Sequence, residues 1–129
     1  MQEQNIKGVQ TEQEYCRLYK VLLKNYGLEV AGLYAYLLDK RGLSIKKTRD
    51  TSTSDNYLDN LGFYCVVSYD ELINELNMTE YKIKKIKKIL RDKGLITEVR
   101  QGLNRPNKIF VQRFEDVYSN QELIGLLSE

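Results

Sequence analysis

Histidine is absent from this sequence of 129 residues, and its absence excludes several kinds of active site. Histidine is the commonest general base in enzymes and the commonest metal ligand in proteins. The chain also lacks a GxxxxGKS or GxxxxGKT phosphate-binding loop and paired carboxylates on a clearly patterned helical face. We therefore expect no enzyme of the triad or zinc type, no other catalytic activity, and no cofactor or metal.

Long apolar stretches are missing as well. A membrane-spanning helix needs about 20 apolar residues, and no run in this sequence approaches that length. The first residues, MQEQNIKGVQTEQE, lack the apolar centre of a signal peptide. We therefore expect a cytoplasmic chain with no membrane partner.

Cysteine is scarce, with only Cys16 and Cys65. Both lie inside apolar segments, YCRLY and FYCVV, where a cysteine usually behaves as a small buried hydrophobic residue. Disulfides are rare in cytosolic proteins. We expect two reduced thiols in the core.

Acidic residues are scarce in about a third of the chain, although the net charge of the whole is only +2. Residues 79–113 carry eleven basic and three acidic residues, a net charge of +8. The rest of the chain carries nine basic and fifteen acidic residues, a net charge of −6. This concentration of positive charge predicts a polyanionic partner.

The first half of the chain contains one clearly patterned helix. Apolar residues at i, i+3, i+4, i+7 and i+8 from Val30 predict a helix over residues 29–41, which Gly42 is placed to end. Residues 15–25 are apolar and fit a short strand or a short helix equally well. Residues 44–60, rich in Ser, Thr, Asp and Asn, predict a long loop. The β-branched and aromatic residues 63–68 predict a strand.

The second half contains two helices with explicit boundaries. Ser68 and Glu71 form a capping box at the start of a short helix. Thr79 is placed as the N-cap of a second helix over residues 79–93, and Gly94 is placed to end it in a Schellman motif.

A β-hairpin is expected after these helices, over residues 95–112, because alternating segments flank a turn with Gly102 and Pro106. A helix, a strand, two helices joined by a tight turn and a hairpin follow one another in a winged helix-turn-helix. We expect this mainly α fold with a small β-hairpin, of the α+β class, over residues 15–118. Residues 1–14 predict a flexible arm, and residues 119–129 a short helix or the start of a linker to an absent C-terminal domain.

The helix expected over residues 79–93 has the properties of a recognition helix in the DNA major groove. Such a helix needs an apolar inner face and polar or basic residues near its N-terminus on the outer face. Ile83, Ile86 and Leu90 supply the inner face. The alternative is that the outer lysines only form a solvated face. We expect base contacts from Glu80, Tyr81, Lys82 and Lys85, and phosphate contacts from Thr79, Lys84 and Lys88.

The turn of the expected hairpin is the second candidate for DNA contact. The segment GLNRPN displays Asn104 and Arg105, and basic residues flank the turn on both sides. A wing arginine can enter the minor groove, where negative potential concentrates. The alternative is an ordinary turn that uses Gly and Pro for its geometry and Arg for solubility. We expect contacts from Arg100, Asn104, Arg105, Asn107 and Lys108.

Two segments resemble a known family. They are LEVAGLYAYLLDKRGLSIKK and, after the loop, FYCVVSYDELINELNMTEYKIKKIKKILRDKGLITEVRQGLNRPNKIFV. Both are similar to the N-terminal domain of RepA-type plasmid replication initiators of low-GC Gram-positive bacteria, and the resemblance covers about residues 15–114. The segment RQGLNRPN is similar to that family's wing pattern, RQGLGKPN.

The resemblance implies a function that the residue patterns do not. It implies that the domain binds double-stranded DNA as a homodimer, at repeated sequences (iterons) of a plasmid replication origin. It also implies contacts with host replication proteins through a separate C-terminal region that this chain lacks. Because a fold does not determine a function, a winged-helix transcriptional regulator and a protein-interaction domain with no DNA role stay open as alternatives.

Overall fold

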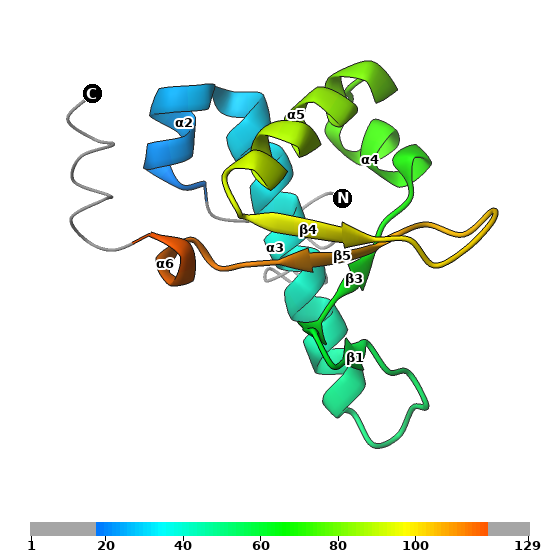
Figure 1. Cartoon of the computed structure of the whole chain (residues 1–129). Coiled ribbons are helices and arrows are strands. Elements are labelled where there is room, and N and C mark those ends of the chain that lie inside the picture. Colours follow the sequence, from blue (N-terminus) through cyan, green and yellow to red (C-terminus); the bar gives the residue numbers. More distant parts are fainter. Residues whose placement is uncertain (1–17, 119–129) are drawn as a thin grey trace, which may run out of the picture.

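A computed structural model describes residues 18–118 as a mixed α+β fold built around one long helix (Figure 1). The segments expected as an N-terminal arm (residues 1–14) and as a C-terminal helix or linker (residues 119–129) lie outside the described residues, as does Cys16. The helices are α2 (Lys20–Tyr26), α3 (Leu28–Arg49), α4 (Tyr69–Leu76), α5 (Glu80–Asp92) and α6 (Phe114–Val117). The strands are β1 (Leu58–Asp59), β2 (Gly62–Phe63), β3 (Cys65–Val66), β4 (Ile96–Val99) and β5 (Lys108–Val111).

Helix α3 is longer than the sequence pattern predicts, and the expected helix end at Gly42 is wrong. The helix continues to Arg49, so residues 44–49 are helical and do not belong to the expected loop over residues 44–60. A glycine within a helix costs only about 1 kcal/mol, which tertiary contacts can outweigh. The extra turns bury Ser44, and the Thr48 hydroxyl donates to the Ser44 carbonyl and accepts from the backbone N–H of Tyr57 at 2.8 Å.

The remainder of the expected loop leads into the small β1–β2 hairpin, of which only β1 lies within residues 44–60. The hairpin packs against the end of α3. Leu58 pairs with Phe63 across it, and the Arg49 guanidinium lies 5.6 Å from the centre of the Phe63 ring. The strand expected over residues 63–68 is therefore divided, because Phe63 belongs to this hairpin whereas Cys65 pairs with Ile109 of β5. In Figure 1 the hairpin and the end of α3 extend together from the body of the domain.

The main sheet has three antiparallel strands in the order β3-β5-β4. The β4–β5 pair is the expected hairpin, and its register joins Ile96 to Val111 and Val99 to Lys108. Helix α3 crosses this sheet (Figure 1). Helix α5 packs against α3 and β4, and α4 packs against α5. The core contains fully buried side chains from α3, α5, β5 and α6, and the Tyr34 hydroxyl at its edge donates to the backbone carbonyl of Gln112. The sequence left a short strand or a short helix open for residues 15–25. Residues 20–25 of this segment are helical and belong to α2.

The helix-turn-helix boundaries follow the expected caps with one difference. The Ser68 hydroxyl accepts from the backbone N–H of Glu71 at 3.1 Å, which is half of the expected capping box. The Glu71 carboxylate faces α3, where it accepts from the Tyr36 hydroxyl and pairs with Lys40 at 3.0 Å. Burial opposes ionisation of Glu71, but hydrogen bonds from Tyr36 and Lys40 outweigh it and lower the pKa of this carboxyl.

Helix α5 begins and ends as the sequence predicts. The Thr79 hydroxyl accepts from the backbone N–H of Lys82 at 3.2 Å. At the other end, Gly94 adopts a φ of +76°, and the backbone N–H of Leu95 donates to the Leu90 carbonyl at 2.9 Å, as in a Schellman motif. The sequence of elements is that of a winged helix-turn-helix, in which α4 and α5 are the two helices and the β4–β5 hairpin is the wing.

No helix within residues 18–118 is long and apolar enough to cross a bilayer.

Candidate nucleic-acid interface

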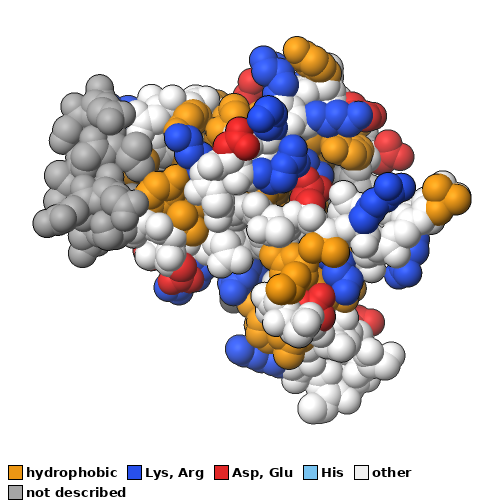
Figure 2. Space-filling model, in the orientation of Figure 1, with side chains coloured by type: hydrophobic (Ala, Val, Ile, Leu, Met, Phe, Trp, Pro, Cys, Tyr) orange, Lys and Arg blue, Asp and Glu red, His pale blue; other side chains and the backbone are white. Residues whose placement is uncertain are grey.

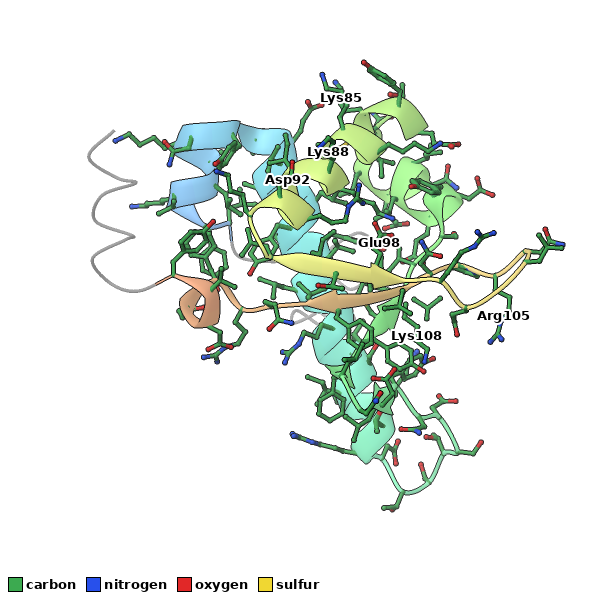
Figure 3. The ribbon with its side chains drawn as sticks, in the orientation of Figure 1. Lys85, Lys88, Asp92, Glu98, Arg105 and Lys108 are labelled. Atoms are coloured by element: carbon green, nitrogen blue, oxygen red, sulfur yellow. The ribbon has the colours of Figure 1, made fainter. Side chains whose placement is uncertain are left out.

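Helix α5 buries one face and exposes a basic one. Ile83, Ile86 and Leu90 are buried as expected, whereas Tyr81 is 74% exposed. Because a helix turns once every 3.6 residues, Tyr81, Lys85 and Lys88 share the outward face. Lys85 and Lys88 project from the body of the domain in Figure 3, and Figure 2 shows Lys and Arg side chains gathered over this helix. The Lys85 ammonium lies 5.7 Å from the centre of the Tyr81 ring.

Three of the expected contact lysines of α5 form ion pairs in the free protein. Lys82 pairs with Glu29 of α3 at 3.0 Å, and Lys88 pairs with Asp92 at 3.2 Å. Lys84 pairs at 2.9 Å with Glu80, whose hydrogen bond raises the pKa of the Lys84 ammonium. All of these side chains are about half exposed or more, and such surface pairs contribute little to stability. The pairs can therefore be exchanged for contacts with DNA at little cost.

The wing tip is exposed and has a defined backbone conformation. Gly102 and Asn104 have positive φ angles of 138° and 61°, and the Gln101 side chain donates to the Pro106 carbonyl at 2.8 Å. Arg105 lies beside the tip in Figure 3 and is exposed. Leu103, which the sequence analysis did not single out, is 80% exposed at the same tip.

Lys108 differs from the other expected wing residues because it faces the β1–β2 hairpin. Its ammonium pairs with Asp59 at 3.1 Å and lies 4.7 Å from the centre of the Tyr64 ring. Its side chain is 26% exposed. Asp59 lies in the segment expected to be a loop, so nothing in the local sequence of the wing indicated this contact. These contacts connect the base of the wing to the β1–β2 hairpin.

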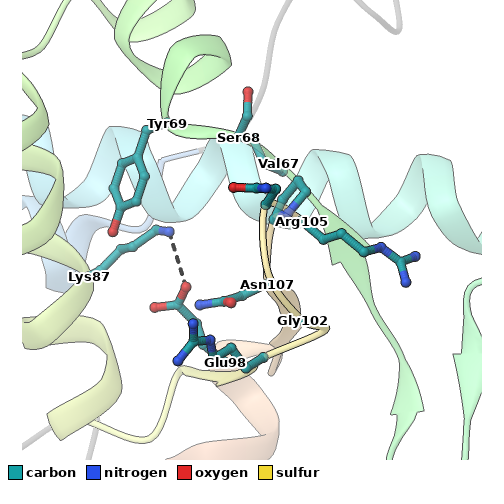
Figure 4. Close-up of a pocket in the computed structure, with 11 residues that line it drawn as sticks. Val67, Ser68, Tyr69, Lys87, Glu98, Gly102, Arg105 and Asn107 are labelled. Atoms are coloured by element: carbon teal, nitrogen blue, oxygen red, sulfur yellow. Dashed lines mark hydrogen bonds and ion pairs between the residues drawn. The ribbon is translucent and has the colours of Figure 1, made fainter.

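A cleft of about 380 Å³ separates the wing from the two helices (Figure 4). Ser68 and Tyr69 line it on the α4 side, and Lys87 lines it from α5. The wing side is lined by Glu98, Arg100, Gly102, Asn104, Arg105, Pro106 and Asn107. The structure thus places the expected wing contacts Arg100, Asn104, Arg105 and Asn107 across one cleft from α5.

Lys87 also lies at this site, and the sequence analysis missed it. It is 3% exposed and pairs with Glu98 of β4 at 3.1 Å. Its position could have been found from spacing, because it lies four residues after Ile83 and three before Leu90, on the apolar stripe of α5.

Comparisons with known proteins agree with this arrangement. Residues 14–123 match the family model described as "Replication initiator protein A (RepA) N-terminus". No curated protein matches the sequence. The fold is similar to a solved "N-Terminal domain of DNA binding protein", with a TM-score of 0.65 and 28% identity over 98% of this chain and 88% of that one.

Two further solved structures share the fold. One is titled "Structure of Rep-DNA complex", with a TM-score of 0.65 and 27% identity over 98% of this chain and 90% of that one. The other is titled "Structure of MDR initiator", with a TM-score of 0.64 and 24% identity over 98% of this chain and 92% of that one, and its likeness concerns the fold alone.

Proposed function

Because this chain belongs to the family of replication initiator protein A N-termini, we propose that it binds double-stranded DNA at repeated sites of a plasmid replication origin. The observation that carries the proposal is the exposed basic face of α5, on a helix that one cleft separates from a wing with two exposed arginines. A solved Rep–DNA complex with the same fold supports it. The function is binding, and we propose no catalysis by this domain.

The geometry supports a division of work between the helix and the wing. The major groove is about 12 Å wide and admits an α-helix, so the outward face of α5 can approach the base edges. Base contacts would come from Glu80, Tyr81, Lys82 and Lys85, and phosphate contacts from Thr79, Lys84 and Lys88. Lys82 and Lys84 would each give up a carboxylate partner, Glu29 or Glu80, as they turn to the DNA.

The wing would contact the adjacent minor groove through its exposed tip. We expect Asn104 and Arg105, which are exposed, to enter the groove, and Arg100 and Asn107, which line the same cleft, to contribute further contacts. Lys108 would act differently from the other four, because it already neutralises Asp59. Its role would be to hold the wing in position.

Binding at repeats fits a homodimer, since two-fold related recognition helices meet half-sites about one helical turn apart. In the whole initiator, contacts with host replication proteins would come from a region C-terminal to this domain. A transcriptional regulator built on the same fold is the second candidate function. The two functions differ in where the protein binds on its plasmid.

Footprinting on the plasmid that encodes the chain tests the proposal. We expect protection of repeated sequences within the origin. Protection confined to a promoter would support the regulator and contradict origin binding. The affinity should also fall steeply with salt, by about 4.5 decades per tenfold rise for roughly five phosphate contacts. Weak salt dependence would favour the protein-interaction alternative.

A pair of charge-matched variants tests whether α5 contacts the bases. Lys82→Ala with Lys85→Ala removes two cations from α5 and should abolish specific binding. Lys46→Ala with Lys47→Ala removes two exposed cations from the far end of α3 and should leave the protected sites unchanged. Equal losses in both variants would mean that only total charge matters, and unchanged binding of the first would exclude α5 as the recognition helix.

A further inference from the structure

Lys87 places a charge on the buried face of the helix expected to contact DNA. Its side chain is 4% exposed, although its neighbours on that face are apolar. A buried charge is unfavourable unless it is paired, and an apolar residue of similar volume at such a position often gives equal or greater stability. Packing alone therefore does not explain a lysine here.

The contacts of Lys87 join three elements. Its ammonium lies 3.1 Å from Glu98 Oε2 on β4 and 4.5 Å from the centre of the Tyr69 ring, at the first residue of α4 (Figure 4). The other carboxylate oxygen of Glu98 lies 2.7 Å from Arg91, one turn further along α5. Glu98 thus bridges two cations of α5, and Lys87 contacts both α4 and the wing strand.

We propose that Lys87 and Glu98 are positioning residues that fix the angle between α5 and the wing, and thereby the ability of the domain to distinguish its DNA sites. This inference rests on the proposed function. Glu98 is two residues before Arg100, where β4 leads into the wing loop. Any rotation of β4 about α5 is therefore transmitted directly to the arginines of the wing.

An ion pair at this position restricts how α5 and β4 can be oriented, which apolar contacts alone do not. Apolar contacts depend on buried area and tolerate sliding, whereas a charged hydrogen bond with a defined distance favours one arrangement. The cleft increases the importance of this contact, because it separates the wing loop from α4 and α5 beyond Glu98. If helix and wing occupy neighbouring grooves, a change in their angle removes contacts at one of the two.

The double variant Lys87→Met with Glu98→Leu tests the role. It leaves the net charge unchanged, fills a similar volume and keeps the residues of the proposed DNA contacts. The probes are a duplex selected by the wild-type chain from a random pool and a scrambled duplex of the same composition. We expect affinity for the selected duplex to fall about tenfold, as when one good base contact is lost, with affinity for the scrambled duplex unchanged. A loss of stability alone would lower both affinities equally.

The matched control is Arg113→Gln with Asp116→Asn, which removes an exposed ion pair outside α5 and the wing. It should keep both affinities. The conservative variant Glu98→Asp keeps the charge and shortens the side chain by one methylene, so it also tests the angle if the double variant fails to fold. We expect it to lower the ratio of specific to non-specific affinity as well.

The outcomes separate this inference from the proposed function. If the wild-type chain selects no sequence from the pool, both are wrong. If it selects a sequence and the folded Lys87 and Glu98 variants keep the wild-type ratio of affinities, DNA binding stands and the positioning role is overturned.

Discussion

Replacing Glu98 alone by leucine should destabilise the domain strongly. The change removes the carboxylate partner of Lys87, whose side chain is 4% exposed, and leaves the Tyr69 ring beside its ammonium. Removing one member of a buried ion pair typically costs about 3–5 kcal/mol, because the remaining charge stays buried. The whole free energy of unfolding of a domain is only about 5–15 kcal/mol. Arg91 adds little to this loss because it is 43% exposed and can be hydrated.

Urea unfolding followed by circular dichroism measures the effect. With an m-value of about 1–3 kcal/mol/M, a loss of this size lowers the midpoint by about 1 M or more. Adding Lys87→Met to Glu98→Leu should restore most of the stability, because the double variant has no buried charge at this position. The exposed pair removed by Arg113→Gln with Asp116→Asn should change the midpoint little.

Two results would refute this reasoning. A wild-type midpoint for the Glu98→Leu variant would show that Lys87 is solvated without its partner. A double variant no more stable than Glu98→Leu would show that lost packing, and not the uncompensated charge, destabilises the single variant.

Three further predictions concern single residues. Glu71→Gln should lower stability at neutral pH. Since folding lowers the pKa of Glu71, the greater stability of the wild type should disappear as the pH falls below about 4.5 and through that lowered pKa. A difference in urea midpoint that stays constant with pH would contradict this. Burial raises the pKa of the Cys65 thiol to about 11, so in a Cys16→Ser variant iodoacetamide should label Cys65 only as fast as the domain opens; labelling at the rate of a free thiol would contradict this. Gly94→Ala should cost about 1–2 kcal/mol in unfolding experiments and Gly94→Asn less, because Gly94 has a φ of +76°; equal costs would contradict the conformational origin.

The candidate DNA-contacting surface was largely predictable because its signals are local. The cap at Thr79, the apolar stripe through Ile83 and the glycine at Gly94 each act within a few residues of the chain. These signals located α5, and the alternating segments located the wing. They did not show that Lys82 is paired before DNA binds, because its partner Glu29 lies on another helix.

The features that the sequence did not predict also have a common cause. Gly42 is a plausible helix end by its own chemistry, yet α3 continues because Thr48 and Arg49 contact a hairpin that begins several residues later. Lys108 is the first residue of the second wing strand, yet its partner Asp59 is 49 residues away. Local preferences of about 1 kcal/mol per residue are overridden when contacts of this kind form.

The sequence by itself determined the order of the helices and the wing, the ends of α5 and the concentration of positive charge on residues 79–113, because caps, periodicity and charge are properties of neighbouring residues. Only the tertiary structure decided the length of α3, the division of the strand expected over residues 63–68, the ion pair of Lys108 with Asp59 and the burial of Lys87 against Glu98. Each of these depends on which distant segments meet, and their free energy comes from contacts that exist only once the chain has folded.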